Sequence, residues 1–224
     1  ENLYGFHLQT LVEGWDSILT PSVIKVMASQ QDLIAAKRLF PSVPAIHRYV
    51  NNDYGGILDN PNPVEGARNW LNRFAQGYAE IIRGLEPFGL SKPYFYACSV
   101  NEVYPSRNAE AIERAVAVEI AFIEELYKMY GDLVAPVTYE AGVGNVHESE
   151  FHLLLELAKA TANRGGMMGY HNYWLENNQY GGPAHLWQYL AGRWEAIDTF
   201  FVAQGCYVDW YGGECGATFG ESGE

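Results

Sequence analysis

A short β-rich run, Tyr94-Phe95-Tyr96-Ala97-Cys98-Ser99-Val100, leads through Asn101-Glu102 into a long helical pattern. A strand followed by an amphipathic helix is one βα unit, and repeated βα units assemble into a parallel sheet. The same alternation recurs on both sides of this stretch, which predicts an α/β fold. We expect strands at 3–8, 23–28, 44–50, 94–100, 134–139, 167–171 and 206–210.

Helical patterns with clear start signals lie between these strands. Ser29 is a capping residue for a helix that stops before Pro41, and Asn62 caps another helix with Pro63 in its first turn. Apolar residues at helical spacing then predict three more helices, with apolar faces over about 112–130, 149–163 and 185–203.

Seven strands with helical crossovers in 224 residues predict one domain, 1–224, built as a TIM-type (β/α) barrel. Only ten residues follow Glu214, so the last βα unit of such a barrel is missing from the chain. Three explanations stay open. The sequence is truncated at its C-terminus, a partner chain completes the barrel, or the sheet is open.

The composition narrows the classes of partner. The chain is 48% hydrophobic, and its 14 basic residues against 27 acidic ones give a formal net charge of −13. Such a field repels nucleic acid and anionic lipid, and no apolar run reaches the roughly 18 residues of a membrane span. The three cysteines form neither a disulfide framework nor a paired metal-ligand spacing. We therefore expect neither a nucleic-acid nor a membrane partner, and no cofactor.

Polar and aromatic side chains collect where the predicted strands end. In a parallel barrel these carboxyl ends meet at one rim, which is where active sites lie. The 14% aromatic content fits rings that stack on sugar faces, although a large aromatic core explains it equally well. The candidate site residues are His7, His47, Arg48, Asn101, Glu102, Glu140, Asn145, His171, Tyr173, Trp174, Trp210 and Glu214.

Two carboxylates brought together at such a rim can divide the work of cleaving a glycosidic bond. With Val100-Asn101-Glu102 after strand four, Gly213-Glu214 after strand seven and Tyr173 after strand six, the sequence resembles the retaining glycoside hydrolases of clan A. That resemblance implies that Glu102 is the general acid/base and Glu214 the nucleophile. It implies a carbohydrate substrate and double-displacement hydrolysis.

Each remaining candidate has an expected task beside these two carboxylates. Asn101 would bind the sugar 2-hydroxyl, and Tyr173 or His171 would hydrogen-bond to Glu214. Glu102 should occupy a drier place than Glu214, so that it starts protonated. The other candidates would contact substrate: Trp174 and Trp210 by stacking, and His7, His47, Arg48, Glu140 and Asn145 through polar groups.

Two other hypotheses about the function remain. Glu102, Glu140, His171 and Asp209 follow or end consecutive strands and could hold a divalent cation in a sugar isomerase or hydrolase. A non-catalytic carbohydrate-binding barrel of a larger assembly is the second. Asp209 and Glu140 are also rivals of Glu214 as the partner of Glu102. The chain departs from the clan in lacking an arginine after strand two, where Arg48 after strand three is a possible substitute, and in lacking strand eight.

Overall fold

The computed structural model describes residues 5–8, 21–27, 29–49, 55–105, 107–142, 145–175 and 193–218, with side chains except at 5–8, 55–56, 172–175 and 213–218. Its strands are β1 (Gly5–Leu8), β2 (Val23–Met27), β3 (Ala45–Arg48), β4 (Phe95–Cys98), β5 (Val134–Ala141), β6 (Met167–Leu175) and β7 (Asp209–Thr218). Its helices are α1 (Gln30–Leu39), α2 (Gly55–Leu58), α3 (Pro63–Leu85), α4 (Ala109–Tyr130), α5 (Leu155–Asn163) and α7 (Arg193–Ala203). Short 3₁₀ helices span Glu86–Phe88, Gly131–Leu133 and Glu148–Leu154.

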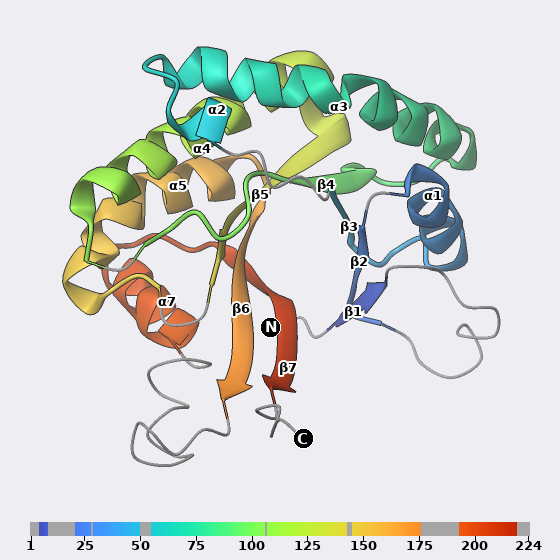
Figure 1. Ribbon diagram of the computed structural model, residues 1–224. Coiled ribbons are helices and arrows are strands. Elements are labelled where there is room, and N and C mark those ends of the chain that lie inside the picture. Colours follow the sequence, from blue (N-terminus) through green and yellow to red (C-terminus); the bar gives the residue numbers. More distant parts are fainter. Residues whose placement is uncertain are drawn as a thin grey trace, which may run out of the picture.

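The seven strands form one parallel sheet in sequence order, β1 to β7. The sheet curls into a half-barrel, and the helices lie against its outer face (Figure 1). Cα atoms of β1 and β7 come within 8 Å of each other, but no ladder joins these two strands in the described part of the chain. The expected TIM-type barrel is therefore wrong, because neighbouring strands pair only from β1 to β7 and the sheet stays open between its edges.

Apolar side chains form a cluster on each of the two faces of the sheet. One face packs on the helices and carries most of the core, including Leu71 of α3 and Phe122 of α4. The other, concave face carries a smaller cluster of Val23, Ile46, Cys98, Val137, Met167 and Tyr211. Because successive side chains of a strand point to opposite faces, this second cluster identifies the positions that look into the half-barrel.

The local signals of the sequence give the expected helix starts. The Ser29 side chain accepts the Asp32 N–H, and the Asn62 side chain accepts the N–H groups of Val64 and Glu65. The predicted helix 149–163 begins instead as the 3₁₀ helix Glu148–Leu154 before α5. Of the predicted helix 185–203, residues 185–192 lie outside the described residues, and α7 covers the rest from Arg193. No helix in the described part of the chain has the length and apolar character needed to cross a membrane.

Candidate active site

Glu102 lies just beyond β4, where the backbone holds it in an unusual conformation. Its φ is +54°, in the left-handed region that costs a non-glycine residue about 1–3 kcal/mol. Its N–H donates to the Glu140 carbonyl at 2.7 Å, and Asn101 forms an isolated β-bridge with Glu140. The strained residue is thus fixed to the end of β5.

The Glu102 carboxylate is bound to His171 of β6. The distance between His171 Nδ1 and Glu102 Oε1 is 2.6 Å, and the imidazole is fully buried. The Glu102 side chain is 47% exposed. The expected dry environment is therefore not found, since one side of this carboxyl group faces solvent and the other faces a buried ring.

Glu214 lies inside β7 and not in the loop after a strand, because β7 runs from Asp209 to Thr218. In the ladder between β6 and β7, Glu214 is the residue that pairs with His171. The ladder shifts its register between Tyr170 and His171, where β7 carries Gly213 as an extra residue. The backbone of Glu214 is therefore next to that of His171, while its side chain lies outside the described residues.

A buried ion pair between Lys25 of β2 and Glu140 of β5 crosses the concave face of the sheet. Glu140 is fully buried, and its two carboxylate oxygens lie 3.0 and 3.1 Å from Lys25 Nζ. Arg48 Nη1 lies 3.7 Å from the same carboxylate. Burial alone would raise the pKa of Glu140, but the charges of Lys25 and Arg48 outweigh it and hold the pKa below its usual value.

Glu140 faces Lys25 because β5 contains a bulge at Tyr139. Val137 belongs to the concave cluster, whereas Thr138 bonds to Thr161 of α5 and Tyr139 packs in the helix-side core. Two successive side chains thus point outward, with Tyr139 at φ +53° and a register shift beside it. Strict alternation from Val137 would have turned Glu140 away from the concave face.

The Lys25–Glu140 pair yields a stability prediction. Lys25→Met should lower the free energy of unfolding by about 3 kcal/mol or more, because it leaves a buried carboxylate without its closest cation. Lys128→Met is the matched control, since Lys128 pairs with Glu125 while itself 63% exposed, and should cost about 0.5 kcal/mol or less. Urea unfolding measures both. Equal losses of unfolding free energy in the two variants would contradict a stabilising buried ion pair between Lys25 and Glu140. A Lys25→Met/Glu140→Met double variant no more stable than Lys25→Met would also contradict it.

A second buried carboxylate, Glu119 of α4, joins the ends of β4 and β5. It accepts hydrogen bonds from the hydroxyls of Ser99 and Tyr104, and both of its oxygens lie 3.1 Å from Tyr139 N. Burial raises the pKa of Glu119 to about 7, although these three donors oppose the shift. Glu119 therefore changes charge near neutral pH.

This raised pKa sets the sign of a pH effect on stability. Between pH 4.5 and pH 7 the folded chain keeps the proton of Glu119 while the unfolded chain releases it, so rising pH favours unfolding. Compared with Glu119→Gln, the wild type should lose about 3 kcal/mol of its free energy of unfolding as the pH rises from 4.5 to 7. Above pH 7 the difference between the two proteins should stay constant. Urea unfolding at pH 5 and pH 8 measures the difference, and a difference independent of pH would contradict the shift.

Three predicted residues do not join this site. His47 is buried on the helix side, with its ring 4.5 Å from Tyr49. Trp210 packs on Phe201 of α7 and its Nε1 donates to Asp198, so stacking on a sugar is wrong for this side chain. Asp209 is exposed at the amino end of β7, away from Glu102, which removes it as a rival of Glu214 and as a metal ligand beside Glu102.

The remaining candidates divide into two groups. Arg48 and Asn101 meet around Glu140, and Asn101 Oδ1 is buried with no hydrogen-bond partner among the described residues. The carbonyl of Asn145 accepts the Tyr139 hydroxyl at 2.8 Å, at the same end of β5. The side chains of His7, Tyr173 and Trp174 lie outside the described residues. Across the part of the chain with described side chains, no three His, Cys, Asp or Glu residues are grouped to hold a metal.

Lys25, Tyr139 and Glu119 were not identified as site residues from the sequence. For Lys25 and Glu119, the sequence contains a feature that could have indicated a buried polar role. Lys25 is a lone charge within the otherwise apolar run 23–28, and a charged residue in a buried strand requires a buried partner. Glu119 lies three residues after Val116 and seven after Ile112, on the apolar face of its helix. The left-handed conformation of Tyr139 has no signal in its residue type.

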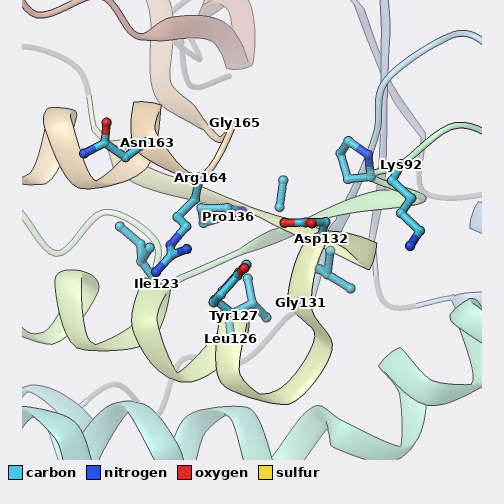
Figure 2. Close-up of a pocket in the computed structure, with 13 residues that line it drawn as sticks. Lys92, Ile123, Leu126, Tyr127, Gly131, Asp132, Pro136, Asn163, Arg164 and Gly165 are labelled. Carbon is cyan, nitrogen blue, oxygen red and sulfur yellow. The ribbon is translucent and has the colours of Figure 1, made fainter.

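A pocket of about 300 Å³ lies at the other end of the sheet, where β5 begins. In Figure 2, Arg164 extends from the end of α5 over Tyr127 of α4, and the guanidinium lies 3.7 Å from the ring centroid. Lys92 and Asp132 also line it. None of the predicted site residues is among those that line this pocket, so it is separate from the Glu102 site.

No family model matches the chain, and no curated protein matches it either. Its function is therefore argued from the geometry around Glu102 and His171.

Proposed function

We propose that the chain is a retaining glycoside hydrolase in which Glu102 is the general acid/base and Glu214 the nucleophile. The observation that carries the proposal is the position of His171. Its imidazole binds the Glu102 carboxylate at 2.6 Å, and its backbone pairs with that of Glu214 in the neighbouring strand. Neighbouring parallel strands lie about 4.8 Å apart, so His171 lies between the Glu102 carboxylate that it binds and the backbone of Glu214.

The reaction takes two steps at these residues. First, Glu214 attacks the anomeric carbon while Glu102, which has to carry a proton at this step, gives that proton to the departing glycosidic oxygen, and a covalent glycosyl-enzyme forms. Next, Glu102 takes a proton from water, and the resulting nucleophile displaces Glu214 and regenerates both groups. His171 is placed to hold the Glu102 carboxyl group through both steps. The half exposure of Glu102 gives water access to it.

The surroundings support these roles. Lys25 and Arg48 contact the buried carboxylate of Glu140, and the carbonyl of the same residue accepts the Glu102 N–H, so this ion pair orders the end of β5 that holds Glu102. Asn101 directly precedes Glu102 in the chain, which suits the contact with the sugar 2-hydroxyl that the resemblance to clan A implies.

A panel of 4-nitrophenyl glycosides tests the proposal, with the first product anomer identified by proton NMR. We expect hydrolysis of at least one member with retained configuration. Inverted configuration would contradict the mechanism. Activity that a chelator abolishes would favour the metal-dependent class, and sugar binding without turnover would favour a non-catalytic carbohydrate-binding protein.

A further inference from the structure

The buried carboxylate of Glu119 does not touch the proposed substrate site, yet it bonds to the segments that form it. It sits in the middle of α4, which packs against β5, and it is fully buried. Its donors are two hydroxyls and one backbone N–H, all neutral. Burying a carboxylate with neutral donors alone is expensive, so its position calls for a reason other than stability.

The first segment that Glu119 holds is the bulge of β5. The N–H of Tyr139, which lies outside the regular ladder at φ +53°, donates to both Glu119 oxygens. A buried backbone N–H needs an acceptor, and Glu119 supplies one where the bulge interrupts the ladder. The Tyr139 hydroxyl bonds the Asn145 carbonyl at 2.8 Å and accepts the Val146 N–H, which fixes the other end of the same residue.

The bulge in turn determines where Glu140 and Glu102 lie. It directs the Glu140 carboxylate toward Lys25 and leaves the Glu140 carbonyl to accept the Glu102 N–H at 2.7 Å. On the other side, Glu119 accepts the hydroxyl of Ser99, three residues before Glu102. One carboxylate therefore holds both strand ends that frame Glu102.

We infer that Glu119 is a positioning residue that fixes Glu102 in its left-handed conformation by holding Ser99, the residue after β4, and the Tyr139 bulge of β5. This inference rests on the proposed function where it concerns protonation of the leaving group. Its structural part, that Glu119 orders the Tyr139 and Glu102 backbone, holds for any function of the site.

Glu119→Gln tests the inference, with Glu125→Gln as the matched control. Glu125 is also a buried carboxylate of α4, but it bonds Arg68 and Lys128 and does not reach β4 or β5. At pH 8, where Glu119 is ionised, the amide of Glu119→Gln keeps one acceptor oxygen where the carboxylate had two. Amide hydrogen exchange by NMR should be at least about tenfold faster at Tyr139 and Glu102, relative to the amide of Met168, and unchanged in Glu125→Gln. Glu119→Ala should accelerate exchange at Tyr139 and Glu102 further. If Glu119→Ala does not fold, the exchange rates of Glu119→Gln alone decide the test.

A second readout separates positioning from general loss of stability. With a glycoside that the wild type hydrolyses, Glu119→Gln should lower kcat/KM at least about tenfold more for the phenyl glycoside than for the 2,4-dinitrophenyl glycoside, since only the former needs a proton from Glu102. Equal losses on both substrates would overturn the proton-positioning role. Unchanged exchange at Tyr139 and Glu102 would overturn the whole inference. If the wild type hydrolyses no glycoside, the proposed function fails while the exchange measurement still decides whether Glu119 orders this backbone.

Discussion

Replacing Glu214 with Gln is expected to lower kcat on a hydrolysed glycoside by about 10⁴-fold or more and to leave the fold intact. An amide keeps the shape of the carboxylate but cannot attack the anomeric carbon, so the covalent intermediate does not form. Glu214 lies in β7 beside His171, and the strand ladder there depends on backbone groups that the substitution does not change. Steady-state kinetics together with thermal unfolding measure the two effects separately.

Asp209→Asn is the matched control for this variant. Asp209 belongs to the same strand and loses its charge in the same way, but it is exposed at the amino end of β7. We expect its kcat to stay within about twofold of the wild type, because surface changes far from a site seldom affect it. A Glu214→Gln variant that keeps its activity would refute the assignment of the nucleophile, as would an Asp209→Asn variant that loses it.

Replacing Glu102 with Ala should give a loss that depends on the leaving group. Without an acid, kcat/KM for a phenyl glycoside should fall by about 10²–10⁴-fold. A 2,4-dinitrophenolate leaves without a proton, so the first step on that substrate should be nearly unaffected and the intermediate should accumulate. Added azide needs no general base and should restore turnover of the dinitrophenyl glycoside, with a glycosyl azide as product.

Glu113→Ala provides the comparison for Glu102. Glu113 is an exposed carboxylate of α4, outside the site, and its loss should affect neither substrate. Equal losses of Glu102→Ala on both leaving groups, with no rescue by azide, would show that Glu102 supports the structure and does not transfer the proton.

Sequence reasoning predicted what depends on local pattern. Alternating strands and helices, the Ser29 and Asn62 caps, and the placement of Glu102 and Glu140 at one end of a parallel sheet all follow from spacing and residue type. The TIM-type barrel predicted from the seven strands was wrong, because counting strands does not show whether the two edge strands of a sheet, here β1 and β7, come together.

The face of the sheet toward which a side chain points was harder to predict than the position of its residue along the strand. One extra residue reverses every side chain after it, so the Tyr139 bulge brings Glu140 inward. That bulge depends on Glu119, distant in sequence, and no rule of local propensity reports it. Trp210 was predicted at the site because it ended the expected strand 206–210, but its neighbour Tyr211 faces the concave side and Trp210 faces α7.

The separation of the Glu102 and Glu214 carboxyl groups in a crystal structure of the wild type decides whether these two residues can act together on one glycosidic bond. Retaining catalysis by these two residues predicts about 5–5.5 Å, the distance at which one carboxylate attacks while the other protonates. A separation of about 6.5–9.5 Å would fit an inverting enzyme, and a larger one would exclude joint action on one bond. Either of these results would contradict the retaining mechanism proposed for Glu102 and Glu214.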